Sequence, residues 1–189
     1  MMGFQQQMNG NTMSNMSNMA QQQSDQDHTS RVEQFLSKLI ESLDQQNPTP
    51  TSPPLPQLTQ QPRIIINGTP FGSRDQFQQL WISLPASNHQ ITSLDVHFLP
   101  SGNTGLGQFI VLAHMKVRFD ESGKNKLGET ALFNNSTVSS ARVLWSHWFG
   151  VTLSCVIDSS MLNNPNSECI SCWDYRFTEN PTKSIFKVE

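Results

Sequence analysis

Apolar and polar residues alternate most regularly between Phe109 and Phe119. Successive side chains of a β-strand point to opposite faces, so every second residue of this stretch would line a core. These inward residues are Phe109, Val111, Ala113, Met115, Val117 and Phe119. The opposite row begins apolar and turns basic, and it consists of Ile110, Leu112, His114, Lys116 and Arg118. Because that row is too apolar for water at one end and too charged for a core at the other, we predict that a protein partner covers it.

The same period of two predicts three more long strands. They are expected from Gln90 to Leu99, from Val143 to Asp158 and from Cys169 to Thr178. In the middle of the second, Gly150 favours a bulge or a sharp bend, because a residue without a side chain weakens an ordinary strand. A short β-branched strand from Arg63 to Asn67 precedes them. Together these segments predict one strongly bent antiparallel sheet.

Apolar residues spaced by three and four predict two amphipathic helices. Ser30 and Glu33 have the spacing of a capping box and predict the start of the first helix. Ser73 and Gln76 repeat that spacing at the start of the second, which ends at Pro85. The apolar stripe of the first helix comprises Val32, Phe35, Leu36, Leu39, Ile40 and Leu43. This order of elements predicts the α+β class, with the helices packed on the concave side of the sheet.

Composition divides the chain into a tail and a domain. Residues 1–28 are rich in Gln, Asn, Ser and Met and show no period, so we expect a disordered tail, either dispensable or containing a short docking peptide. Residues 29–189 are expected to form one domain. Within it, residues 48–62 hold six of the eleven prolines, which favours irregular coil or polyproline II. We interpret this insert as a linker pinned by Leu55 and Leu58, with an SH3 or WW ligand as the alternative.

Net charge and cysteine content narrow the function classes. A net charge of -3 over 189 residues excludes a globally basic surface of the kind that binds nucleic acids, so any RNA contact has to be local. Three cysteines without a secretory signal point to a reducing compartment and free thiols. No apolar run is long enough to cross a bilayer, so no membrane association is expected.

The residues that could support catalysis or metal binding form no complete site. Cys169 and Cys172 lie three apart on a strand, so they would face opposite sides, and no second pair completes a zinc tetrahedron. His147, expected to face inward near Asp158 or Tyr175, is the best candidate for a buried acid or base, and a hydrogen-bonded core histidine is the simpler interpretation. We therefore predict no catalytic residue, no metal and no cofactor.

The outward rows of the four long strands combine into a candidate protein interface. A large aromatic side chain among charges of both signs is typical of specific protein interfaces, and a solvated sheet face is the alternative. The candidate interface residues are Asp95, His97, His114, Lys116, Arg118, Trp148, Asp174 and Arg176.

Five segments, in this order, resemble one known family. They are RIIINGTPF (residues 63–71), LPSGNTG (99–105), KVRFDESGKNKLGE (116–129), LWSHWFGV (144–151) and DYRFTENPTKSIFKV (174–188). The chain resembles the fungal mRNA transport regulators, the small subunits of heterodimeric mRNA export receptors within the nuclear transport factor two-like superfamily. Where relatives place a second helix before the first strand, this chain has its Pro-rich segment.

The resemblance implies a cone-shaped α+β fold and obligatory pairing, sheet against sheet, with the matching domain of the large receptor subunit. It also implies a non-catalytic protein of the nucleus and nuclear pore that shuttles to the cytoplasm. The heterodimer would contact Phe-Gly nucleoporins and carry messenger ribonucleoprotein and large pre-ribosomal subunits. Arg176 would meet an acid of the partner, and Lys124 and Lys126 are the candidates for RNA or ribosome contact.

An enzyme is the alternative that the same superfold leaves open. A small-molecule enzyme of the isomerase or dehydratase type would use the conical cavity, and ionisable side chains would converge on an open pocket there. Filling of that space by Trp145, Phe149, Trp173 and Phe177 would count against catalysis. We predict that the space is filled and that the protein is not an enzyme.

Overall fold

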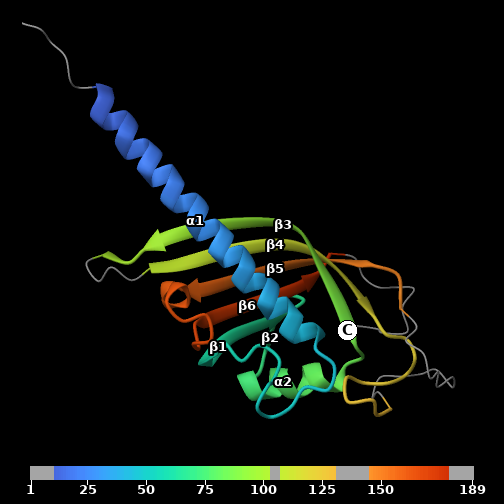
Figure 1. Cartoon of the computed structure of the whole chain (residues 1–189). Coiled ribbons are helices and arrows are strands. Elements are labelled where there is room, and N and C mark those ends of the chain that lie inside the picture. Colours follow the sequence, from blue (N-terminus) through green and yellow to red (C-terminus); the bar gives the residue numbers. More distant parts are fainter. Residues whose placement is uncertain (1–10, 103–106, 131–144, 179–189) are drawn as a thin grey trace, which may run out of the picture.

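Two α-helices and a six-stranded sheet make up the described part of the chain (Figure 1). The computed structural model describes residues 11–102, 107–130 and 145–178, with residues 11–26 as backbone. In chain order the elements are α1 (Asn11–Asp44), β1 (Leu58–Ile66), β2 (Thr69–Phe71), α2 (Arg74–Ser83), β3 (Ser87–Pro100), β4 (Gly107–Phe119), β5 (Phe149–Asp158), the 3-10 helix η2 (Ser159–Leu162) and β6 (Ile170–Phe177). This content confirms the predicted α+β class.

The strand order of the sheet is β2-β1-β6-β5-β4-β3. Neighbouring strands are antiparallel except β1 and β6, which run parallel. The sheet is therefore mixed, and the prediction of a purely antiparallel sheet is wrong for this one pair. A parallel pair requires a long connection between its strands. Here that connection contains α2, β3, β4 and β5, and the returning strand β6 fits between β1 and β5.

The alternation between Phe109 and Phe119 is realised in β4. All six apolar residues of the inward row are buried, whereas four of the five residues of the opposite row are exposed and Arg118 is half-buried. β4 pairs with β3 on one side and with β5 on the other, so both rows extend across the sheet. We call the side that carries Ile110 to Arg118 the outer face and the opposite side the inner face.

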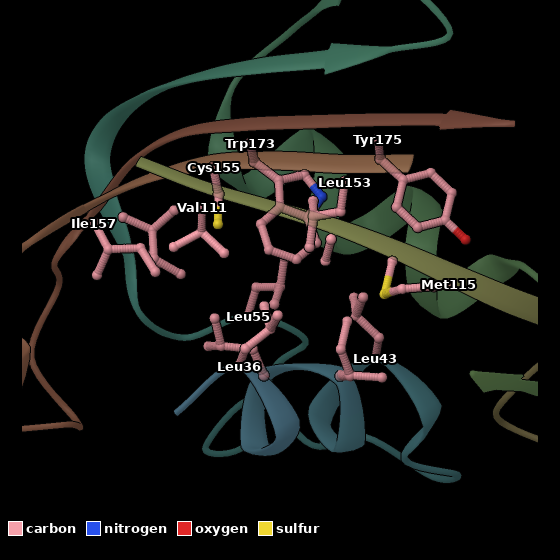
Figure 2. Packing of buried hydrophobic residues seen from close by; sticks show 14 of the residues in the cluster. Leu36, Leu43, Leu55, Val111, Met115, Leu153, Cys155, Ile157, Trp173 and Tyr175 are labelled. Atoms are coloured by element: carbon pink, nitrogen blue, oxygen red, sulfur yellow. The ribbon is translucent and has the colours of Figure 1, made fainter. Parts of the chain in front are cut away.

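Helix α1 lies across the inner face of the sheet (Figure 1). Its predicted apolar stripe is buried throughout. Figure 2 shows Leu36 and Leu43 of α1 packing toward Trp173 and Met115 of the sheet. Burial of one large apolar side chain contributes about 1.5–3 kcal/mol. Several such contacts along one stripe therefore suffice to hold the helix on the sheet.

The start of α1 differs from the prediction. The helix begins at Asn11, so the start predicted at Ser30 is wrong, and residues 11–28 are helical rather than a disordered tail. Residues 1–10 lie outside the described residues. No Gly or Pro occurs between Asn11 and Asn47, and extending a nucleated helix by one residue costs far less than starting one. At α2, by contrast, the predicted capping box of Ser73 and Gln76 is confirmed.

The Pro-rich segment is anchored by the two leucines that were predicted to pin it. Leu55 and Leu58 are both fully buried. β1 begins at Leu58, so the last part of the predicted insert belongs to a strand. The pairing of β1 with β6 is irregular between Leu58 and Arg63, and Pro62 falls within that interval. A proline has no N–H group to donate to a regular ladder, so it is tolerated where the pairing is irregular.

Of the bulge or sharp bend predicted at Gly150, the bulge is absent, and a side chain at this position would press on a neighbouring one. Gly150 pairs in regular register with Lys116. A Cβ atom at this position would lie 2.2 Å from Thr178 Oγ1, and the Thr178 N–H donates to the Gly150 carbonyl over 2.9 Å. The register shifts of the long strands occur instead in β3, between Ile91 and Ser93, and between β5 and β6.

β5 begins at Phe149, six residues later than predicted. Residues 143 and 144 lie outside the described residues. Ser146 is buried, because its N–H donates to the Phe119 carbonyl over 2.9 Å and its Oγ accepts from the Phe119 N–H over 3.0 Å. With Ser146 turned inward, Trp145 and His147 are exposed, and their predicted place in the core is wrong.

Candidate protein interface on the outer face

Cross-strand pairing assembles most of the predicted interface residues on the outer face. Paired residues of neighbouring strands place their side chains on the same side of a sheet. Three rows cross β3, β4, β5 and β6: Asp95, Leu112, Ser154 and Asp174; His97, Ile110, Val156 and Cys172; Ser93, His114, Thr152 and Arg176. These rows and the adjoining Lys116 bring together six of the eight predicted residues.

The centre of this face is apolar. Ile110 and Leu112 are each 37% exposed, and Val156 lies half-buried beside Ile110. Both exposed residues belong to the outward row recognised in the sequence, but the predicted set of eight contained no aliphatic residue and left them out. An apolar centre with charged residues around it is the usual anatomy of a protein interface.

Arg176 is paired within its own strand. Its Nε donates to Asp174 Oδ1 over 2.7 Å and its Nη2 donates to Asp174 Oδ2 over 2.6 Å. These hydrogen bonds raise the pKa of the Arg176 guanidinium above its ordinary value. The Arg176 side chain remains 54% exposed, so the pair adds little to folding stability. An acid of a partner would have to share Arg176 with Asp174.

The two remaining predicted residues, Arg118 and Trp148, lie together beyond the three rows. The Arg118 Cζ atom is 4.7 Å from the centroid of the Trp148 ring and 4.7 Å from that of Trp145. We call these three residues the Arg118 clamp. Sequence reasoning missed the contribution of Trp145, because the alternation extrapolated through Ser146 placed it in the core. The W-x-x-W spacing beside the strand was the available signal.

Lys126 is not available for contact with RNA or ribosomes, so this prediction is wrong. It is 2% exposed, and its Nζ donates to Ser87 Oγ over 2.8 Å. Burial lowers the pKa of Lys126 to about 8, although the charge of Asp44 opposes the change. Lys124, the other predicted residue at this loop root, is half-buried.

Replacing Lys126 by methionine should reveal this burial as a change in the pH dependence of stability. Between pH 8 and the ordinary lysine pKa of 10.5, the unfolded chain binds more protons than the folded protein, so stability of the wild type rises with pH. Between pH 7 and pH 9.5, the free energy of unfolding of the wild type should therefore rise by about 2 kcal/mol relative to that of Lys126→Met. Urea unfolding of both proteins measures the difference. Lys124→Met, which removes the same charge, should show no such gain, and a flat difference for Lys126→Met would contradict the burial.

A buried polar cluster that the sequence did not reveal ties α1 to the sheet. Asp44 Oδ1 lies 2.6 Å from His89 Nδ1, and Oδ2 accepts from the His89 backbone N–H over 2.7 Å. His89 Nε2 lies 2.9 Å from the Tyr175 hydroxyl, and Ser87 Oγ donates to Asp44 over 2.8 Å. The His89 side chain has no exposed surface. With both ring nitrogens engaged, His89 serves as a structural residue rather than as a free acid or base.

The histidine predicted to be a buried acid or base, His147, is exposed and packs against Phe149 with ring centroids 4.2 Å apart. One sequence signal could have pointed to the real cluster. Asp44 ends α1, where the helix dipole disfavours a negative charge, so a carboxylate there needs a specific partner. Nothing local identifies that partner as His89, which follows 45 residues later in the sequence.

Other chemistry is equally scarce in the described part of the chain. Residues 11–102, 107–130 and 145–178 contain no group of three or more His, Cys, Asp or Glu side chains that could hold a metal ion. The three cysteines are free, and Cys155 and Cys169 are buried. None of the described helices combines the length and the apolar character needed to span a membrane.

Comparison with known proteins identifies the family. The family described as nuclear pore RNA shuttling protein Mtr2 matches residues 18–188. The chain belongs to the Mtr2 family. It is 41% identical to the mRNA transport regulator MTR2 of Candida albicans over 185 residues, which cover 86% of this chain and 99% of that protein. The corresponding protein of Saccharomyces cerevisiae is 33% identical over 138 residues, covering 67% of this chain and 73% of its own length.

A solved structure of an Mtr2 complex resembles this fold. The crystal structure of the C. albicans Mtr2-Mex67 M domain complex contains a chain that matches with a TM-score of 0.64 and 37% identity, covering 82% of this chain and 99% of that chain. Membership of the Mtr2 family confirms the resemblance to the fungal mRNA transport regulators that was seen in the sequence. It assigns the protein to RNA transport at the nuclear pore at the level of the family.

Proposed function

We propose that this protein is the non-catalytic small subunit of a nuclear mRNA export receptor. Its outer face would pair, sheet against sheet, with a large subunit of the Mex67 type. The observation that carries this proposal is the exposed pair Ile110 and Leu112 at the centre of a face with charged residues on both sides. The solved complex of a relative with a Mex67 M domain supports the choice of partner.

The finer predictions about transport extend this proposal. As a heterodimer the protein would shuttle between nucleus and cytoplasm and carry messenger ribonucleoprotein, and also large pre-ribosomal subunits. Phe-Gly nucleoporins would be contacted through the heterodimer. With a net charge of -3 the chain itself is poorly suited to hold a polyanion, so we assign cargo contact to the complex, with Lys124 as the local basic residue of this chain.

Packing supports a binding role over catalysis. Of the four aromatic residues predicted to fill the interior that an enzyme of this fold would keep open, Trp173 and Phe149 are buried in one hydrophobic cluster and Phe177 packs against it, whereas Trp145 is exposed. The buried histidine, His89, is hydrogen-bonded at both ring nitrogens. Because these aromatic side chains occupy the interior and both nitrogens of His89 are engaged, we propose that the protein is not an enzyme.

Replacing Leu112 by aspartate tests the interface. The protein is titrated into the Mex67-type M domain of the same organism in a calorimeter. We expect at least a tenfold loss of affinity, because the partner would have to bury an unpaired carboxylate at the apolar centre. Leu127→Asp is the matched control, since Leu127 is 41% exposed in the loop after β4 rather than on the sheet. Equal affinities of wild type and Leu112→Asp would place the partner elsewhere, and no binding by the wild type would remove the proposed function.

A further inference from the structure

Two arginines of the predicted interface set differ in their partners. Arg176 is held by both oxygens of Asp174. The Arg118 guanidinium lies instead against two tryptophan rings, and its Nε is buried without a hydrogen-bond partner among the described residues. A buried donor that has no acceptor costs free energy, and the cost is larger when the group is charged. Of these two arginines, Arg118 is therefore the one that an external anion would satisfy.

The Arg118 clamp fixes the orientation of its guanidinium. Trp145 and Trp148 flank the group at equal distances of 4.7 Å from Cζ to each ring centroid. Both rings attract the cation through their electron-rich faces. Because the Nε is buried, an approaching carboxylate would be met by the terminal N–H donors of the guanidinium, whose planar arrangement matches two carboxylate oxygens. Because the side chain is already ordered, binding there loses little further rotamer freedom.

Backbone contacts hold the two indoles in place. Trp145 forms a β-bridge with Asp120, and the following Ser146 exchanges two hydrogen bonds with Phe119. Trp148 directly precedes the first residue of β5. Trp145 remains 36% exposed and Trp148 39% exposed, so both rings still offer apolar area to a partner. Tryptophan and arginine are the residue types that most often dominate the affinity of protein interfaces.

The clamp continues the apolar centre of the outer face. Arg118 belongs to the same row of β4 as Leu112, and six residues of strand place it about 20 Å away at about 3.4 Å per residue. An interface of ordinary size, about 800 Å² on each partner, covers that span. A protein fits this combination of exposed Ile110, Leu112 and two indoles better than the phosphates of RNA, which a chain of net charge -3 repels.

We propose that the Arg118 clamp receives a carboxylate of the large receptor subunit and anchors that end of the heterodimer. This assignment rests on the proposed function and adds the residue that provides the main charged contact. An Asp or Glu of the partner accepts two N–H bonds from Arg118, and the partner covers the exposed indole rings around them. Arg176 keeps Asp174 as its acid and contributes less.

Calorimetric titration of full-length variants into the Mex67-type M domain tests the proposal. Arg118→Gln should lower the affinity at least tenfold, and Arg118→Lys should lower it at least threefold, because an ammonium keeps the charge but not the planar fork. Lys38→Gln is the control for net charge, since Lys38 is exposed on α1 and thus on the opposite side of the sheet. It should bind like the wild type.

A double-mutant cycle then identifies the acid. Neutralising the correct Asp or Glu of the M domain should weaken binding to the wild type but not to Arg118→Gln. Thermal unfolding shows whether the variants are folded. If Arg118→Gln is not folded, the affinity of Arg118→Lys decides the outcome. If Arg118→Gln and Arg118→Lys both bind the M domain as tightly as the wild type does, the proposal is overturned, whereas the proposed heterodimer is not. A loss of affinity only for a fluorescent oligouridine RNA would also overturn it, because the clamp would then serve a phosphate.

Discussion

Replacing Asp44 by alanine is expected to lower the free energy of unfolding by about 3–5 kcal/mol, because it leaves buried charge and donors without their acceptor. The carboxylate accepts from the His89 backbone N–H and from Ser87, and it lies against the His89 ring. The buried ammonium of Lys126 loses its nearby negative charge. Urea unfolding followed by circular dichroism measures the loss.

Asp44→Asn is the matched control for this prediction. The amide keeps the volume and one acceptor oxygen, so it should lose about 1–3 kcal/mol, less than alanine. A loss below about 1 kcal/mol for Asp44→Ala would show that water or backbone groups replace the carboxylate, and it would contradict the role assigned to the cluster.

The same cluster predicts a loss of stability in acid. Burial alone would raise the pKa of Asp44, but the hydrogen bonds and charge of His89 outweigh it and hold that pKa below the ordinary 3.8. Between the two pKa values the unfolded chain binds more protons, so stability rises with pH. The advantage of the wild type over Asp44→Asn should therefore be complete above pH 3.8 and shrink as the pH falls through the pKa of the folded protein.

Replacing Trp173 by alanine should lower the free energy of unfolding by about 3–5 kcal/mol. Trp173 is the largest fully buried side chain, and it lies between α1 and the sheet (Figure 2). Alanine would leave a cavity that the rigid sheet on one side and α1 on the other cannot close. The midpoint of urea unfolding, followed by circular dichroism because a fluorophore is removed, measures the effect.

Trp173→Phe separates packing from hydrogen bonding. The Trp173 Nε1 is buried without a hydrogen-bond partner, so removing it forfeits no bond. Phenylalanine keeps an aromatic ring, and its cost should stay below about 1.5 kcal/mol. If phenylalanine destabilised the protein as much as alanine does, an unrecognised bond of the indole would have to be responsible.

Long alternating segments were predictable because strand geometry is local. The row from Phe109 to Phe119 turned inward as expected, and Trp173 and Tyr175 followed the same rule in β6. Errors arose where a single contact interrupts the period. Ser146 turns inward because Phe119 supplies both of its hydrogen-bond partners, and the alternation extended through it misplaced Trp145 and His147.

Capping signals proved ambiguous for a different reason. The S-x-x-E spacing at Ser30 also fits the interior of a helix, since a favourable start is needed only where the chain upstream is not already helical. At Ser73 the preceding Gly72 and the strand β2 leave no helix to continue, and the capping box forms. The same motif therefore predicted the start of α2 correctly and the start of α1 wrongly.

By itself the sequence determined the α+β class, the buried row of β4 and the half-apolar outer row that raises the question of a partner, because alternation depends only on the strand that carries it. Only the tertiary structure decided which polar groups are buried and what they contact. Asp44 contacts His89, the buried Lys126 donates to Ser87, and Trp145 packs against Arg118, because elements distant in sequence are packed together. Burial and pairing of charges depend on that packing, and no local period encodes it.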